Sequence, residues 1–482
     1  MFDWRPIFLV IGLLLVPLGL GMMVPVAVDL SLDHPDWQVF MVSSALTLFV
    51  GVGLFLSNRG AKSELNIKQA FLLTTLVWLI LPGFAALPFV FSELELSFTD
   101  GYFEAMSGLT TTGSTVITGL DSAPPGILIW RAILQWLGGI GIIVMAIAVL
   151  PMLKIGGMQL FRMESSDASE KILPRATQIS GAITGLYITL SLVCFMALVF
   201  AGMPSFDAAA HAMTTIATGG FSTSDASLGN FDNALVQYIV VLFMIIGSLP
   251  FVLYLQVLRG RPMKLWRDNQ VQFFLSLVIL LVAIMAGWLM MTQGFNFFDA
   301  LRYSSFNTIS ILTGTGYSTA AFDTWGSLAI IFFLIIMFIG GCAGSTTCGI
   351  KVFRFQVLFS AVFTQMKKLT TPHAVYQPQF NHRPIPHSVI DSVLGFLFLF
   401  AMSYVVLCVA LALTGLDFVT VLSGAATSIS NVGPGLGEVI GPSGTFSPLP
   451  DVAKWLLAAG MLLGRLELLT VFVLFTPSFW RA

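Results

Sequence analysis

Apolar stretches of about twenty residues recur along this chain from one end to the other. A helix of roughly that length crosses the ~30 Å hydrocarbon core of a bilayer. Only 10% of the 482 residues are charged, against about 25% in a typical soluble protein. The sequence therefore predicts an all-α polytopic membrane protein and excludes a soluble enzyme, a nucleic-acid-binding protein and a disordered regulator. The expected spans, bounded by Pro, Gly or charged residues, are 7–28, 39–56, 69–91, 126–150, 179–203, 235–258, 270–292, 328–350, 389–413 and 452–477.

Basic residues gather in alternate loops between these spans. The opposite loops hold Arg302, with Lys454 near the end of a span, and otherwise carry acidic residues. The positive-inside rule then places the basic loops and both termini in the cytoplasm. The acidic outer loops either concentrate cations at an outer mouth or simply keep those loops hydrated. The sixteen basic residues are Arg59, Lys62, Lys68, Lys154, Arg162, Lys171, Arg175, Arg259, Arg261, Lys264, Arg267, Lys351, Arg354, Lys367, Lys368 and Arg383.

A fourfold internal repeat follows the first two spans. In each unit, a span leads into a short amphipathic segment that opens near Phe, ends in a Gly-containing turn and precedes the next span. Such a segment cannot cross the bilayer, so we expect re-entrant half-helices whose freed backbone faces protein or water. Four span–half-helix–span units predict pseudo-fourfold symmetry around a central pore, with two extra N-terminal spans at the periphery. The four segments are 98–113, 206–220, 298–316 and 418–433.

The repeat divides the chain into five parts. We expect two peripheral spans in 1–68, followed by four pore repeats, the third of which contains an intramembrane loop at 340–349. The pore repeats are 69–175, 176–268, 269–387 and 388–482.

The four turns carry chemistry that suits a monovalent cation. They hold no ionised side chain and are rich in Gly, which lets the backbone turn its carbonyls inward. Rings of carbonyl oxygens can replace the hydration shell of an ion, and the C-terminal ends of half-helices add partial negative charge. A divalent-selective pore would more plausibly present Asp or Glu here. The residues predicted to line this monovalent-cation site are Thr111, Thr112, Gly113, Thr218, Gly219, Gly220, Gly314, Thr315, Gly316, Asn431, Val432 and Gly433.

These turns and their flanks resemble the TrkH/KtrB family of bacterial potassium-translocating subunits, over essentially the whole chain. The similar stretches are Leu109-Thr-Thr-Thr-Gly-Ser-Thr, Ile216-Ala-Thr-Gly-Gly-Phe-Ser-Thr and Asn431-Val-Gly-Pro-Gly-Leu-Gly. The two extra spans and the length favour the TrkH branch. The resemblance implies K⁺ uptake across the bacterial inner membrane through a filter that keeps one Gly per repeat. Those glycines would be Gly113, Gly220, Gly316 and Gly433, with Gly219 competing in the second repeat and Gly314 leaving the third register open.

A run of small and polar residues interrupts the eighth span between Gly340 and Gly349. It predicts either a broken helix facing protein or water, or close packing of small residues between helices. The resemblance implies an intramembrane loop that obstructs the pore and moves on gating. The predicted gate residues are Gly340, Gly341, Ala343, Gly344, Ser345, Thr346, Thr347 and Gly349, together with Arg465.

Arg465 stands well inside the last expected span. A guanidinium there is costly unless it is paired or hydrated. Arg465 either faces the cavity of the central pore, where its charge would hinder cations, or forms a structural bridge to another helix. Glu467 is a poor partner within the same helix.

The resemblance also implies partners: a homodimer of the membrane subunit, and a TrkA-like nucleotide-binding ring that docks on the basic loops, especially 351–387. The sequence itself contains no phosphate-binding Gly motif and no mid-span nucleophile–base pair or metal ligands. We therefore expect a transporter in contact with lipid, without enzymatic activity and without a cofactor other than the K⁺ it carries. Na⁺- or H⁺-coupled potassium symport on the same fold stays open as an alternative.

Overall fold

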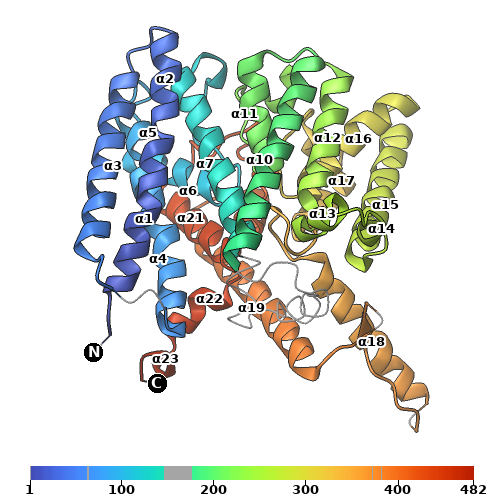
Figure 1. Cartoon of the computed structure of the whole chain (residues 1–482). Coiled ribbons are helices and arrows are strands. Elements are labelled where there is room, and N and C mark those ends of the chain that lie inside the picture. Colours follow the sequence, from blue (N-terminus) through green and yellow to red (C-terminus); the bar gives the residue numbers. More distant parts are fainter. Residues whose placement is uncertain (1, 62–64, 146–175, 372, 382, 482) are drawn as a thin grey trace.

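The structure is a computed structural model that describes residues 2–61, 65–145, 176–371, 373–381 and 383–481. Long helices stand side by side and form the body of the molecule, and both chain ends lie at the same end of this bundle (Figure 1). We call that end the inner end and the opposite one the outer end. Five of the basic residues that were used to orient the chain lie outside the described residues, namely Lys62, Lys154, Arg162, Lys171 and Arg175.

Seven helices, counted within the described ranges, are long and apolar enough to cross a membrane. They correspond to seven of the ten expected spans and confirm a polytopic helical protein. They are Arg5–Ser31 (α1, Arg5–Gly21, continued by α2, Met23–Ser31), α3 (Trp37–Ser57), α4 (Ile67–Ala85) with α5 (Leu87–Phe91), α7 (Pro125–Val144), α10 (Ala176–Phe200), α15 (Asn269–Thr292) and α19 (His387–Ala412).

The other three expected spans are not straight helices. Two of them, for which no interruption was predicted, bend sharply. The span predicted at 235–258 bends by 97° between α12 (Ala234–Ser248) and α13 (Phe251–Leu258). Pro250 lies in this break, and proline offers no N–H to continue a helix. The span predicted at 452–477 bends by 101° after α21 (Asp451–Arg465), before α22 (Leu469–Phe472).

The third irregular span begins as α17 (Ser327–Ile336) and then leaves the helical conformation until α18 (Val352–Thr370). The predicted interruption at 340–349 therefore exists and extends beyond both of its expected ends. Small residues allow this backbone to pack closely: a Cβ on Gly340 would collide with the carbonyl of Cys348, and one on Gly341 would approach the Ser248 carbonyl to 2.9 Å. The segment 337–351 is called the loop below.

The four predicted half-helices are present as α6 (Phe98–Leu109), α11 (Ser205–Ile216), α16 (Phe297–Leu312) and α20 (Phe418–Ser430). Three of them begin on a side-chain N-cap that accepts the backbone N–H three residues later, from Ser97, Asn296 or Asp417. α16 has 16 residues where the others have 12 or 13, about one helical turn more. This extra turn explains the longer spacing of the third repeat.

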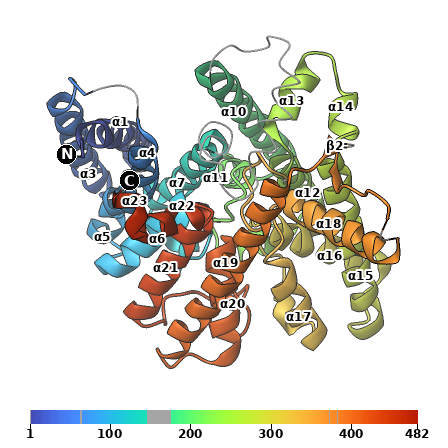
Figure 2. The same ribbon diagram turned by 90° about the horizontal axis from the view of Figure 1, so that it is seen from below.

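The packing of the half-helices closes the repeats into a ring. The second span of one unit packs against the half-helix of the next: α7 against α11, α12 against α16, and α21 against α6. Seen from below, the units surround a common centre (Figure 2). The N-terminal helices α1 to α3 pack against α4 and α7 and so lie outside this ring, as expected.

The remaining short elements connect the spans. α18 extends away from the bundle at its inner end (Figure 1), and a two-stranded hairpin follows it. These elements are α14 (Met263–Trp266), α23 (Pro477–Arg481), β1 (Gln379–Phe380), β2 (Arg383–Pro384), and the 3₁₀ turns η1 (Leu120–Ser122), η3 (Ser227–Asn230), η4 (Phe322–Thr324) and η5 (Val473–Phe475).

The contact between α1 and α3 depends on small residues, and this yields a prediction. A Cβ on Gly12 would lie 2.7 Å from the Gly51 carbonyl oxygen and from the Phe55 nitrogen. Gly12→Val should therefore destabilise the protein by about 1–3 kcal/mol through overpacking, measured as a lower melting temperature in detergent. Gly53→Val on α3 is the matched control, because a Cβ there meets nothing within 4 Å. Equal melting temperatures would contradict this packing role.

Candidate functional site

The four half-helices end in the same backbone motif. The residue after the last turn is left-handed in every unit, with φ of +53° at Thr111, +49° at Thr218, +66° at Gly314 and +53° at Asn431. The N–H of the following residue donates to the carbonyl five residues earlier, a pattern that defines a Schellman C-cap. These bonds are Thr112 to Ser107 (2.8 Å), Gly219 to Thr214 (2.8 Å), Thr315 to Ser310 (2.9 Å) and Val432 to Thr427 (3.0 Å).

Two of these left-handed positions are occupied by threonine. A positive φ is a genuine outlier for a β-branched residue, and such strain costs on the order of 1–3 kcal/mol per residue. Asn431 tolerates the conformation and Gly314 adopts it freely. The first two turns therefore keep their shape because the surrounding structure imposes it, a situation that is typical of functional sites.

Two positions after the left-handed residue, every unit has a glycine that also has a positive φ: +89° at Gly113, +81° at Gly220, +84° at Gly316 and +117° at Gly433. A Cβ on each of them would fall closer than 3.0 Å to a carbonyl oxygen of the neighbouring unit. A larger residue would therefore have to displace backbone. The pairs run in order around the molecule: Gly113 to Gly219, Gly220 to Thr315, Gly316 to Val432, and Gly433 to Thr112.

These four contacts close a circle, so the turns meet around one centre. The circle is narrow, because a Cβ on Gly113 would also lie 3.6 Å from the carbonyl oxygen of Thr315 in the unit after next. The same pattern defines the register. Gly316 is equivalent to Gly113, while Gly314 occupies the left-handed position of Thr111. In the second unit, Gly220 belongs to the ring and Gly219 supplies its carbonyl.

Side chains fasten adjacent turns to one another. Asn431 donates to Thr112 Oγ1 (2.9 Å), and Ser114 Oγ donates to the carbonyl of Gly433 (2.6 Å), which ties the fourth unit to the first. Gln135 on α7 donates from Nε2 to the carbonyl of Gly219 (2.5 Å) and accepts from the Phe221 N–H through Oε1 (3.0 Å), which ties the first unit to the second.

A buried ion pair supports the outer side of the first turn. Glu104 on α6 accepts hydrogen bonds from Arg131 Nε (2.8 Å), from Thr115 Oγ1 (3.0 Å) and from the Val116 N–H (2.9 Å). Arg131 also donates to the Ser222 carbonyl (2.7 Å) in the second unit. Arg131 was not among the site residues predicted from the sequence, although it links the first unit to the second. The polar Glu104 within a half-helix was the available signal.

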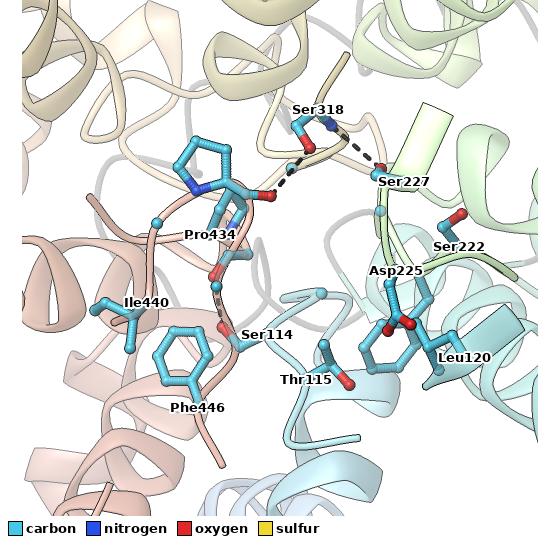
Figure 3. Close-up of a pocket in the computed structure, with 18 of the residues that line it drawn as sticks. Ser114, Thr115, Leu120, Ser222, Asp225, Ser227, Ser318, Pro434, Ile440 and Phe446 are labelled. Carbon is cyan, nitrogen blue, oxygen red and sulfur yellow. Dashed lines mark hydrogen bonds between the residues drawn. The ribbon is translucent and has the colours of Figure 1, made fainter. Parts of the chain in front are cut away.

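A pocket opens on the outer side of the ring, and all four ring glycines line it. Figure 3 shows Ser114 and Pro434 beside its wall, and Ser318 bonded to Ser227 across the second and third units. Ser318 Oγ also donates to the Pro442 carbonyl (3.2 Å). The pocket wall combines hydroxyl groups and backbone with apolar side chains such as Leu120, Ile440 and Phe446, and its charged residues are Asp225 and Arg131.

The loop lies against the inner side of the ring. Thr218 Oγ1 donates to Thr346 Oγ1 (3.1 Å), and Cys348 Sγ lies 3.8 Å from Thr111 Oγ1 and 4.0 Å from the Thr110 carbonyl. The loop thus touches the turns of the first two units. It also passes the third, because the Cys348 nitrogen would lie 3.8 Å from a Cβ on Gly314.

The break in the sixth span holds this loop in place. The carbonyls of Gly247 and Ser248, left without helical partners by the bend, accept the N–H groups of Thr346 (3.2 Å) and Cys342 (3.0 Å). A broken helix at membrane depth must satisfy such groups within the protein. The loop and the bend therefore stabilise each other.

Arg465 is buried, and it connects the loop with α7. Its guanidinium contacts Cys348 Sγ and donates to the carbonyl of Gly138 (2.9 Å). It also lies 5.6 Å from the ring centre of Trp78 on α4. Arg465 thus contacts the loop through Cys348, which was not among the predicted gate residues, and joins it to α7 through the Gly138 carbonyl.

Glu467 pairs with Arg354 at the start of α18. Positive φ angles at Glu467 (+56°) and Leu468 (+51°) turn the chain sharply here, and the Leu469 N–H donates to the Glu467 carbonyl (2.5 Å). This tight turn explains why the last span does not continue. Among the described residues, no group of three or more His, Cys, Asp and Glu could hold a metal ion.

Four half-helices whose C-terminal turns form a closed ring, with an entrance on one side and a polar loop on the other, define a membrane protein built to pass small ions. The sequence profile of the TrkH family, described as "Cation transport protein", matches residues 36–481. The chain belongs to this family of transport proteins, which confirms the expectation of a transporter and not an enzyme.

Relatives that match over their full length support this family assignment. The chain is 44% identical over 479 residues to the Trk system potassium uptake protein TrkI of Halomonas elongata, which covers 99% of this chain and 97% of that protein. It is 38% identical over 484 residues to the Trk system potassium uptake protein TrkH of Escherichia coli K12 (99% and 100%). The crystal structure of the potassium transporter TrkH from Vibrio parahaemolyticus is 37% identical and superposes with a TM-score of 0.92 over 100% of both chains.

The buried ion pair of the first unit gives a second prediction. Glu104→Gln leaves the charge of Arg131 buried without its carboxylate, a change that typically costs about 3–5 kcal/mol. We expect a clearly lower melting temperature in detergent. Asp121→Asn, an exposed carboxylate in η1 on the same outer side, should melt like the unmodified protein. If the two variants melt alike, Glu104 does not hold the first turn in place.

Proposed function

We propose that this chain carries K⁺ across the bacterial inner membrane through the ring formed by Gly113, Gly220, Gly316 and Gly433 and the carbonyls of the residues before them. The observation that supports it best is the circular order of the glycine–carbonyl contacts. Backbone oxygens from Thr112, Gly219, Thr315 and Val432 would take the place of water around the ion. The names of the relatives, potassium uptake proteins, favour K⁺ as the cargo.

The physical basis is a site that binds weakly enough to release. Carbonyl dipoles offer partial charge without an ionised group, so a monovalent ion can enter and leave. The ends of the half-helices add roughly −0.5 e each, directed at the centre. The turns Thr111–Gly113 and Asn431–Gly433, with their counterparts in the other two units, form this lining. Hydroxyls around the entrance offer further ligands during dehydration.

The gate in this proposal is the loop, with Gly340, Gly341, Ala343, Gly344, Ser345, Thr346, Thr347 and Gly349 as its predicted residues. It lies against the ring and is held by the bend at Gly247 and Ser248. Arg465 adds a buried positive charge next to the loop, which would oppose a cation on the inner side. Opening would require the loop to leave its hydrogen bonds.

The surroundings of the protein also belong to the proposal. The positive-inside rule favours a cytoplasmic inner end with both termini. α18 extends from that end with Lys367 and Lys368 exposed near its C-terminus, and a TrkA-like nucleotide-binding ring could dock there. Lys351 and Arg354, the first basic residues of the predicted docking segment 351–387, are buried. A homodimer of the membrane subunit, embedded in lipid, completes the expected assembly. No nucleic acid and no cofactor other than the transported K⁺ is invoked.

Na⁺- or H⁺-coupled symport is the alternative on the same fold. Glu467, the carboxylate predicted within the last span, is paired with Arg354, which leaves it a poor proton carrier. Proteoliposomes with clamped Na⁺ and pH gradients separate the mechanisms. K⁺ uptake that follows only the K⁺ gradient and the voltage supports a channel-like path, and uptake that follows either other gradient supports symport.

The ring gives a third prediction. In Gly433→Ser the new side chain would begin 2.9 Å from the Thr112 carbonyl oxygen and should widen or distort the ring. We expect K⁺-over-Na⁺ selectivity, measured from reversal potentials in planar bilayers, to fall on the order of tenfold, because carbonyl spacing sets the match to the ion. Gly202→Ser is the control. It has a similar positive φ of +95° but open space around its Cβ. Unchanged selectivity in Gly433→Ser would remove this turn from the ion path.

Arg465 gives a fourth prediction, designed to separate charge from packing. Arg465→Gln removes the positive charge and keeps a polar side chain, and it should raise basal K⁺ flux in liposomes without a regulatory partner. Arg465→Lys keeps the charge and loses the planar guanidinium, so its flux should stay low. If both variants raise the flux equally, the residue acts as a structural bridge and its charge is not the barrier.

A further inference from the structure

A second hollow lies at the inner end, away from the ring. It is formed by α13, by α14, by the start of α15 and by the β1–β2 hairpin. Its cationic residues are Lys264, Arg267 and Arg383, and its carboxylate is Asp268. Asp268 Oδ1 accepts the N–H groups of Gln270 (2.9 Å) and Val271 (3.2 Å) as the N-cap of α15. The hollow therefore keeps an excess of positive charge while its carboxylate is engaged elsewhere.

Both walls of the hollow are held in position. The hairpin is fastened to α18, because Ser360 Oγ donates to the Gln379 carbonyl and accepts its N–H, both at 2.9 Å. On the opposite side, Gln356 on α18 donates to the carbonyl of Asn269 (2.9 Å). Arg383, which pairs with Phe380 across the hairpin, is thus held on the opposite side of the hollow from α14, which carries Lys264 and is followed by Arg267.

Three exposed apolar residues lie in the same segment as Lys264 and Arg267, and one of them, Met263, lines the hollow. Leu258 is 72% exposed, Met263 55% and Trp266 60%. They lie where two spans end, within a segment that also carries Arg259 and Arg261. Tryptophan is enriched at membrane–water interfaces, and basic pockets between spans at the cytoplasmic side suit lipid head groups. A soluble anion would need the charges but would gain nothing from the exposed apolar residues.

We propose that this hollow binds the phosphate head group of an anionic phospholipid of the inner leaflet, with its acyl chains against Leu258, Met263 and Trp266. Lys264, Arg267 and Arg383 supply the positive charge that the phosphate requires. Asn381 and Gln256, which also line the hollow, add amide donors for the glycerol or head-group oxygens. The lipid site stands independently of the ion path.

The position of the hollow also links it to the loop. The segment 251–270, which carries α13 and α14, is hydrogen bonded to the loop at both ends. At its start, the Phe251 N–H donates to the Gly344 carbonyl (3.0 Å), and at its end Gln270 Oε1 accepts the N–H of Ala343 (3.1 Å). A lipid that orders this segment stabilises the loop in its present position. This regulatory step rests on the proposed gate and deepens it: the anionic lipid holds the path closed.

Binding can be tested on the full-length protein in neutral detergent. The melting temperature is measured with increasing dioctanoyl phosphatidylglycerol, dioctanoyl phosphatidylcholine or inorganic phosphate. We expect phosphatidylglycerol alone to raise it. Lys264→Gln/Arg267→Gln should raise the half-saturating phosphatidylglycerol concentration by roughly tenfold or more. The reason is that each Lys or Arg near an anionic lipid adds to the binding free energy. Arg383→Gln, on the opposite wall of the hollow, should also raise the half-saturating phosphatidylglycerol concentration.

The matched control is Arg259→Gln/Arg261→Gln, which removes two charges from the same segment outside the hollow. It should bind phosphatidylglycerol like the unmodified protein. Equal weakening in both double variants would show diffuse attraction and overturn the site. An equal effect of inorganic phosphate at the same concentration would show a soluble-anion site and overturn the lipid assignment.

Flux measurements test the link to the gate separately. Basal K⁺ flux should be several-fold lower in phosphatidylcholine liposomes containing one quarter phosphatidylglycerol than in pure phosphatidylcholine, and Lys264→Gln/Arg267→Gln should lose this difference. If phosphatidylglycerol binds but does not change the K⁺ flux, the regulatory step is overturned, while the proposed lipid site stands. The absence of any K⁺ flux would overturn the proposed function, while the melting measurements would still decide the lipid site.

Discussion

The structure depends on one constraint, namely that backbone groups released from a helix inside a membrane must find partners within the protein. The half-helices meet it with a Schellman cap and a left-handed residue, as at Thr111 and Asn431. After that cap, the chain proceeds in every unit through a glycine with positive φ, which lies close to a carbonyl of the neighbouring unit. A ring of oxygens thus follows from the way in which four short helices end.

The same constraint explains the loop. The bend near Pro250 releases the carbonyls of Gly247 and Ser248, and the loop supplies the N–H groups that they need. The third unit differs from the others because its second span, α17, has only 10 residues in the helical conformation. The chain that would have completed this span instead crosses the inner side of the ring. In this unit, a largely buried segment with many small and polar residues stands where the rest of the spanning helix was expected.

Much of this architecture could be predicted from the sequence, because it is encoded locally. Hydrophobic length defines the spans, and short segments that end in Gly-rich turns define the half-helices. The bend at Pro250 had a signal, since proline breaks a helix, but the apolar residues around it masked that signal. The turn at Glu467 and Leu468 had none, because both residues are compatible with a helix. Its cause is tertiary: Glu467 reaches Arg354, which is 113 residues away in the chain.

The periodicity of the sequence does not reveal which residues contact one another over long distances along the chain. Gln135 meets Gly219, and Arg465 meets Cys348, across separations of 84 and 117 residues. Neither pair follows from charge or spacing, because one joins an amide to a backbone carbonyl and the other joins a guanidinium to a thiol. Both join a span of one unit to a turn or loop of another. Closure of the ring creates these contacts, and they in turn hold the strained threonines in place. The local code therefore determines which turns form, and the contacts between units determine that they keep a conformation which Thr111 and Thr218 would not adopt alone.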